Sequence, residues 1–123
     1  MSAIPYCDDV LDRSVPVVQL VDVAKTLGVA ISRVHQMVRD RQLLAFKRDR
    51  VPVVPEAFLD GEGDILKGLP GLIAVLHDGG YQDDEILGWL FDEDDSLPGG
   101  YPVAAMHTQS AREVMRRAQA LAF

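Results

Sequence analysis

The spacing of apolar and small residues between positions 20 and 38 constrains the fold more than any other feature of this sequence. Helical periodicity runs through two adjacent segments, first in Leu20, Val23, Ala24 and Leu27 and then in Val34, Met37 and Val38. Gly28 lies between the segments, where a residue that can adopt positive φ permits a tight turn. Small Ala24 lets the two helices approach and branched Val34 fills their crossing, so the pattern predicts a helix-turn-helix.

The start and the outward face of the second helix follow from the same pattern. Ser32 is a good N-cap, so we expect the helix to begin near it, and we expect Val29 to be a buried anchor just after the turn. The outward face has donors and acceptors that suit base edges and phosphates: Ser32, Arg33, His35, Gln36 and Arg39. A lone histidine such as His35 is more often a plain surface residue, but the face as a whole is a candidate for nucleic-acid recognition.

A short β-hairpin is predicted directly after the second helix. The run 43–54 contains two β-prone pieces around a charged tip, which consists of Lys47, Arg48, Asp49 and Arg50. A hairpin in this place is the wing of a winged helix-turn-helix, and its three basic residues would lie over a phosphate backbone. We expect Pro52 to confine the returning strand to a sheet edge and Pro55 to start another helix.

Charge is strongly segregated along the chain. The whole sequence has twelve Lys and Arg against nineteen Asp and Glu, a formal net charge of −7, which excludes a protein that coats nucleic acid through bulk positive charge. Residues 25–50 nevertheless contain seven basic and two acidic side chains, whereas residues 51–111 contain one lysine and twelve acids. Because charges act over a Debye length of roughly 8 Å, the basic segment can attract a polyanion by itself. The alternative is a basic surface that only pairs with the acidic half.

The acidic second half has the pattern of an all-α lobe. Apolar periodicity predicts helices over 69–76, from about 83 and over 110–121, with Trp89 in the core. Asp60–Asp64 fails as a calcium loop, because the sixth and twelfth positions hold Ile65 and Gly71, so this stretch is expected to be a solvated linker. The chain is therefore predicted to be mostly α with a small β-hairpin wing. Its expected parts are a flexible N-terminal tail (1–16), a winged helix-turn-helix domain (17–60) and a packed α-helical C-terminal domain (61–123).

Several classes of protein are not supported by the residues. Cys7 is the single cysteine and cannot form an internal disulfide, and neither a signal peptide nor a membrane span is evident, so we expect a soluble, cytoplasmic protein. The three histidines are scattered and no phosphate-binding glycine loop or nucleophile motif occurs, so we expect no enzyme, no metal site and no cofactor. No heptad-like dimerisation helix is present, which favours a monomer.

Longer runs of sequence resemble a known family. They are Asp8–Asp12, Leu69–Leu72, His77–Tyr81, Trp89–Phe91 and Arg112–Ala120. With these runs and its helix-turn-helix, the chain resembles an actinobacterial family of winged helix-turn-helix DNA-binding proteins, described in mycobacteria as substrates of a membrane serine/threonine kinase. The resemblance implies that double-stranded DNA is bound through Arg33, Gln36 and Arg39 of the second helix and through Lys47, Arg48 and Arg50 of the wing.

The resemblance also implies a serine/threonine kinase as a partner, because the family's kinase target is a threonine in an N-terminal extension. This sequence departs from the family there: its first threonine is Thr26, inside the first predicted helix, and only Ser2 and Ser14 lie in the tail.

Two functions follow as hypotheses. The first is a DNA-binding protein, a transcriptional regulator or a nucleoid-associated factor, with its second helix in the major groove and its basic wing on phosphates. The second is a protein-interaction adaptor that binds a partner through Trp89 or the acidic run 92–95, since the C-terminal half also resembles the toxin-binding domain of some antitoxins. The target site, the direction of regulation and any effector do not follow from the sequence.

Overall fold

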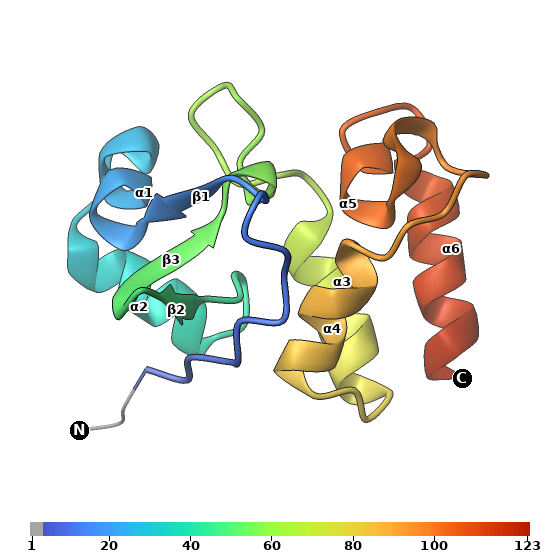
Figure 1. Cartoon of the computed structure of the whole chain (residues 1–123), viewed down its shortest axis with the longest axis horizontal. Coiled ribbons are helices and arrows are strands. Elements are labelled where there is room, and N and C mark those ends of the chain that lie inside the picture. Colours follow the sequence, from blue (N-terminus) through green and yellow to red (C-terminus); the bar gives the residue numbers. More distant parts are fainter. Residues whose placement is uncertain (1–3) are drawn as a thin grey trace.

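A computed structural model describes residues 4–123 of the chain (Figure 1). Its first half contains three strands and two helices: β1 (Val17–Gln19), α1 (Leu20–Leu27), α2 (Ile31–Arg39), β2 (Phe46–Arg48) and β3 (Val51–Pro55). The remaining elements are two 3₁₀ turns and four helices: η1 (Glu56–Phe58), α3 (Leu69–Asp78), α4 (Asp83–Leu90), η2 (Pro98–Gly100), α5 (Pro102–Ala105) and α6 (Ala111–Ala122). This arrangement confirms the predicted fold class, a winged helix-turn-helix followed by a helical lobe.

The helix-turn-helix forms as its spacing predicts. Gly28 ends α1 with a φ of 69°, and the next backbone N–H, that of Val29, closes the turn on the carbonyl of Ala24 at 3.0 Å. Val34 is fully buried where α1 and α2 cross. Two details were predicted wrongly. Ala30 rather than Ser32 is the N-cap of α2, and Val29 is 37% exposed, because the buried side chains of α1 and α2 already fill the crossing.

The sheet has three strands rather than the predicted two. Its order is β1-β3-β2, all antiparallel, so β3 is the central strand. The expectation that Pro52 lies on an edge strand is therefore wrong, although the local geometry still suits proline. Gln19 at the end of β1 pairs with Val53, so Pro52 has only Lys47 of β2 as a partner and needs no N–H on its other side. Pro55 is followed only by the short turn η1 rather than by a full helix.

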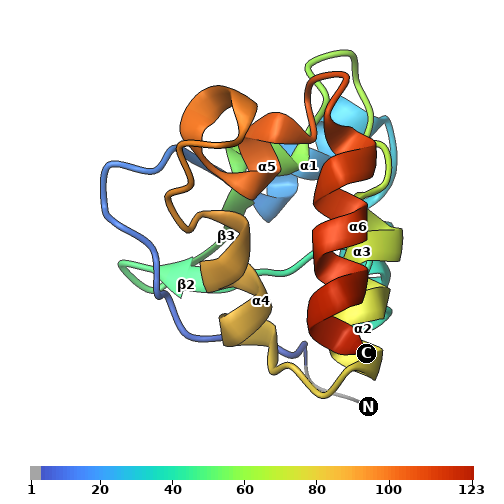
Figure 2. The same cartoon turned by 90° about the vertical axis from the view of Figure 1, so that its right-hand side faces the viewer.

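The C-terminal helices pack together and against the winged half, with α6 running along α3 (Figure 2). Buried side chains from both halves form one hydrophobic cluster. Trp89 is half-buried and packs against this cluster, and Phe91 stacks on Tyr101 with their ring centroids 5.6 Å apart. Leu121, in the last turn of α6, is 47% exposed.

The N-terminal segment is the largest departure from the prediction. Residues 4–16 cross the molecule and lie along the β2–β3 hairpin, so they are a packed part of the domain and not the expected flexible tail (Figure 1). Residues 1–3, including Ser2, lie outside the described part of the chain. We call residues 4–16 the N-terminal strap.

The helix crossing gives a direct test of these burial assignments. Replacing Val34 by alanine should lower the free energy of unfolding by about 2 kcal/mol, because it leaves a cavity between α1 and α2. Replacing Val29 by alanine should change it by less than about 0.5 kcal/mol, because this side chain faces solvent. Urea denaturation of both variants measures the difference, and equal losses would contradict the assignment.

Candidate nucleic-acid interface

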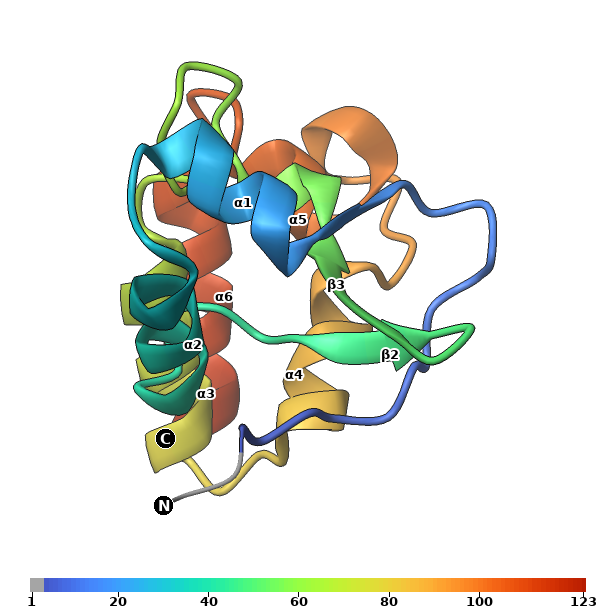
Figure 3. The ribbon, with the colours of Figure 1, turned by 90° about the vertical axis from the view of Figure 1, so that its left-hand side faces the viewer.

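The elements expected to contact DNA lie on one side of the molecule. Figure 3 looks onto α1, α2 and the β2–β3 hairpin, with the C-terminal helices behind them. Helix α2 is amphipathic: Val34, Met37 and Val38 are its buried residues, and its other face points away from the core. A helix and a hairpin exposed on one side match the two elements with which winged proteins contact a duplex.

The predicted recognition residues of α2 differ in their surroundings. Ser32, Arg33 and Gln36 are exposed, whereas His35 and Arg39 are half-buried. The amide nitrogen of Gln36 donates a hydrogen bond of 2.9 Å to the carboxylate of Asp40, one turn further along the helix. Arg33 has no ion pair within residues 4–123, so its guanidinium is available to an anion. The Nε atom of Arg39 is buried and has no hydrogen-bond partner in the same part of the chain.

The wing turns through two residues, Asp49 and Arg50, which both have positive φ, 52° and 69°. Two residues in this conformation make a tight hairpin turn whose twist matches the strands, a geometry that asparagine and glycine adopt most easily. Arg50 is exposed at this tip. Lys47 is exposed as well, and its Nζ atom lies 5.2 Å from the centre of the Tyr6 ring. Asp49 pairs with Arg13 at 2.7 Å, but both side chains are about 70% exposed, so water weakens this pair.

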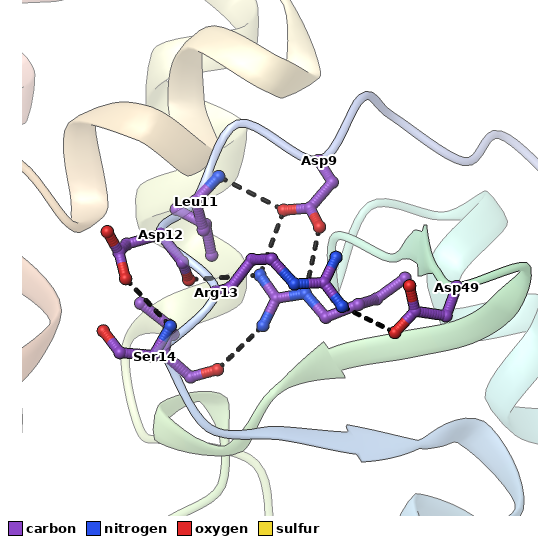
Figure 4. A network of polar contacts seen from close by, with 8 residues as sticks. Asp9, Leu11, Asp12, Arg13, Ser14 and Asp49 are labelled. Atoms are coloured by element: carbon purple, nitrogen blue, oxygen red, sulfur yellow. Dashed lines mark hydrogen bonds and ion pairs between the residues drawn. The ribbon is translucent and has the colours of Figure 1, made fainter.

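Arg48, which was predicted to contact phosphate, is bonded to the strap within the molecule. Its Nε and Nη2 atoms donate to the two carboxylate oxygens of Asp9 at 3.0 and 3.1 Å, and it also donates to the carbonyl oxygens of Val15 (2.9 Å) and Asp12 (3.3 Å) (Figure 4). Its side chain is only 9% exposed, with the guanidinium 5.5 Å from the centre of the Phe46 ring. The strap therefore takes up the hydrogen-bonding groups of Arg48.

The ion pair between Arg48 and Asp9 also shifts the pKa of each of the two side chains. The hydrogen bonds from Arg48 lower the pKa of Asp9 below its usual value, and the bonds to Asp9 raise the pKa of Arg48. Both shifts favour the charged forms, so the pair persists at neutral pH.

The strap contacts β2 and the start of the wing turn. The backbone N–H of Cys7 donates to the carbonyl of Ala45 at 2.9 Å, and Cys7 forms a parallel bridge with Phe46. With the contacts of Tyr6, Asp9 and Arg13 described above, each residue from 46 to 49 has a partner in the strap. Sequence reasoning missed this, although the acidic run Asp8–Asp12 followed by the basic tip Lys47–Arg50 was a signal of their attraction.

The basic segment is thus partly neutralised within the molecule and partly free. Arg48 is bound by Asp9, and Arg41 pairs with Asp83 of α4 at 3.0 Å. Arg33 and Arg50 have no such carboxylate partner among residues 4–123. The reading in which the whole basic surface pairs with acids is therefore wrong for these two arginines.

The described residues give little support to a reactive cysteine, a metal site or a membrane-spanning helix. Burial, and then the charge of Asp83, raises the pKa of Cys7 to about 12, so its thiolate is not populated at neutral pH. Among residues 4–123 no group of three His, Cys, Asp or Glu side chains is arranged to hold a metal ion. No helix in this range has both the length and the apolar character needed to cross a bilayer.

The fold and the exposed helix and hairpin define a winged helix-turn-helix protein. A family model described as "DNA-binding protein Rv2175c, wHTH domain" matches residues 3–59, and a second, "Rv2175c C-terminal domain of unknown function", matches residues 66–122. The chain is 43% identical over 134 residues to "DNA-binding protein Rv2175c" of Mycobacterium tuberculosis (strain ATCC 25618 / H37Rv), covering 100% of this chain and 92% of the relative. This chain belongs to the Rv2175c family.

A solved structure supports the same relationship. The NMR structure of Rv2175c superimposes on the chain with a TM-score of 0.87 at 44% sequence identity, covering 99% of this chain and 91% of the other. The first family model begins at residue 3, so the matched winged region includes the residues of the strap.

The pair between Arg48 and Asp9 predicts a stability that depends on pH. In the folded state the pKa of Asp9 is lowered, so the pair contributes fully above the unfolded pKa of about 3.9 and its contribution is lost as pH falls through the lower, folded value. The Asp9→Asn variant should therefore be less stable than the wild type by about 1 kcal/mol at neutral pH, and the difference should shrink as the pH falls below 4.

Chemical denaturation between neutral and acidic pH measures this difference. Asp95→Asn is the control, because Asp95 is exposed and forms no ion pair within the described residues. A difference between Asp9→Asn and the wild type that stays constant over the whole pH range would contradict the assignment.

Proposed function

We propose that this protein binds double-stranded DNA, with α2 in the major groove and the β2–β3 wing on the flanking backbone. The observation that carries the proposal is the pair of exposed arginines, Arg33 on α2 and Arg50 at the wing tip, which have no carboxylate partner among residues 4–123 of this acidic protein. Membership of the Rv2175c family supports it, because the M. tuberculosis relative bears the name DNA-binding protein.

In this proposal the polar and basic residues of α2 and the wing have separate roles. Ser32, Gln36 and the half-buried His35 and Arg39 face base edges, where side-chain donors and acceptors distinguish base pairs. Arg33, Lys47 and Arg50 contact phosphates, which fix the position of the protein but do not read sequence. Arg48 does not touch DNA; it holds the wing to the strap so that Arg50 is presented at a fixed place.

The distribution of charge favours one orientation of the protein on DNA. Residues 51–111 contain twelve acids and a single lysine, and α4, whose first turn holds three of these acids, lies behind the helix-turn-helix in Figure 3. A duplex is attracted to the side with Arg33 and Arg50 and repelled from the opposite side. Non-productive encounters through the C-terminal lobe are thereby disfavoured.

The finer assignment, a transcriptional regulator or a nucleoid-associated factor, rests on the base-facing side chains of α2. A regulator concentrates at a few sites with a common sequence, whereas a nucleoid-associated factor distributes widely along the chromosome. Genome-wide capture of bound DNA distinguishes the two patterns.

Salt dependence tests the proposed contacts. Each phosphate contact releases condensed counterions, so Arg33→Ala and Arg50→Ala should each weaken binding on every duplex and reduce the slope of log K against log salt by about one. Fluorescence anisotropy with a labelled duplex across a salt series measures both quantities.

Arg112→Ala is the matched control, because it removes the same charge from an exposed position on α6. It should leave the slope unchanged. A double variant of Arg33 and Arg50 that binds like the wild type would show that DNA lies on another surface.

A further inference from the structure

An acidic residue, Asp49, lies at the tip of the wing that is proposed to meet phosphates. It is exposed, it directly precedes Arg50, and its φ of 52° is a conformation that aspartate tolerates better than most residues. A carboxylate in this place repels a duplex unless a cation accompanies it. The cation is Arg13 of the strap, whose Nη2 atom donates to a carboxylate oxygen of Asp49 at 2.7 Å (Figure 4).

Arg13 lies in a tight turn of the strap, and the wing holds both ends of that turn. The backbone N–H of Val15 donates to the carbonyl of Asp12 at 3.1 Å, and the carboxylate of Asp12 accepts the N–H of Ser14 at 2.8 Å. Arg48 donates to the carbonyl oxygens of Asp12 and Val15, the first and last residues of the turn. The nearly buried arginine of the wing therefore fixes the backbone that carries the exposed arginine of the strap.

The pair with Asp49 leaves most of the Arg13 guanidinium free. A guanidinium has five N–H donors, and within residues 4–123 the bonded nitrogen of Arg13 is Nη2. The two side chains are 71% and 70% exposed, so water screens their attraction. A phosphate at the wing tip can replace water on the remaining donors. Because Asp49 already holds the side chain in one place, less conformational entropy is lost when the phosphate binds.

The other acids of the strap are engaged or lie elsewhere. Asp9 accepts two hydrogen bonds from Arg48. Asp8 lines a hollow beside the first turn of α4, and Asp12 lines a cleft beside η1. The exposed charged side chains at and beside the tip are three basic residues against one acid: Arg13, Lys47, Arg50 and Asp49. The tip is therefore basic, and the strap supplies one of its three cations.

We propose that the DNA-contacting tip of the wing is built from two segments of the chain, and that Arg13 of the strap contacts a phosphate there together with Arg50. This inference rests on the proposed DNA binding and adds to it a contact residue outside the helix-turn-helix and the hairpin. Arg48 turns inward and holds the strap, and Arg13 supplies the outward charge that Arg48 does not. Asp49 is a positioning residue for Arg13.

The test must separate a phosphate contact from simple neutralisation of Asp49. Arg13→Ala is therefore measured in the wild type and in the Asp49→Asn variant, where no carboxylate needs neutralising. In both backgrounds it should weaken binding several-fold on every duplex and reduce the slope of log K against log salt by about one. Fluorescence anisotropy with a labelled duplex across a salt series gives both quantities.

Two further variants serve as controls. Arg13→Lys keeps the positive charge and should keep the slope of the wild type. Arg116→Ala removes an arginine that is also exposed and ion-paired, 3.3 Å from Glu113 on α6, and should leave the slope unchanged. All these side chains are on the surface, so each variant should keep the wild-type melting temperature within a few degrees.

An unchanged slope for Arg13→Ala, with a slope that Arg50→Ala does reduce, would overturn the role of Arg13 and leave the proposed DNA binding intact. A slope that falls in the wild-type background but not in Asp49→Asn would overturn it as well, since Arg13 would then only neutralise Asp49. Failure of the wild type to bind any duplex at low salt would instead overturn the proposed function, and the inference with it.

Discussion

The bond network around Arg48 is the interaction on which the wing depends. Strands of three to five residues are too short to be stable as an isolated hairpin, and β2 is an edge strand with one side open. The strap covers that edge, and Asp9 neutralises the guanidinium that would otherwise be left nearly buried without a counter-ion. The hairpin, and with it the position of Arg50, is fixed by a segment nearly forty residues away in sequence.

Carboxylates divide the arginines of this protein into two groups. Asp9, Asp83 and Asp94 bind Arg48, Arg41 and Arg117 within the molecule, each in a pair of 3.0 Å or less. These pairs tie the strap to the wing, the end of α2 to α4, and α6 to the loop after α4. The arginines left without such partners in the described chain include Arg33 and Arg50, on the side that carries α2. An acidic protein can in this way present a basic surface of limited size.

Local patterns in the sequence were sufficient to predict the helices and the helix-turn-helix. The positions of Ala24, Gly28 and Val34 define α1 and α2 because the contacts between these helices are close in sequence. The strand β1 was missed because three residues are too few to show an alternating pattern. The exposure of Val29 was also missed, since it depends on how completely other side chains fill the crossing.

The candidate site was predicted less completely than the fold. The basic character of α2 and the wing could be derived from composition, but charge alone does not distinguish an arginine that faces solvent from one that faces Asp9. That distinction depends on the path of the strap, which has no periodicity of its own.

The single hydrophobic cluster joins the two regions of the chain that the family models match. Two family models divide the sequence near residue 60, yet Phe58 and Leu66 on either side of this boundary are both buried in the same cluster, and the N–H of Leu66 donates to the carbonyl of Phe58 at 2.8 Å. Severing the chain there would expose apolar surface on both fragments at once. The two named regions therefore share one hydrophobic core, and we expect them to unfold together.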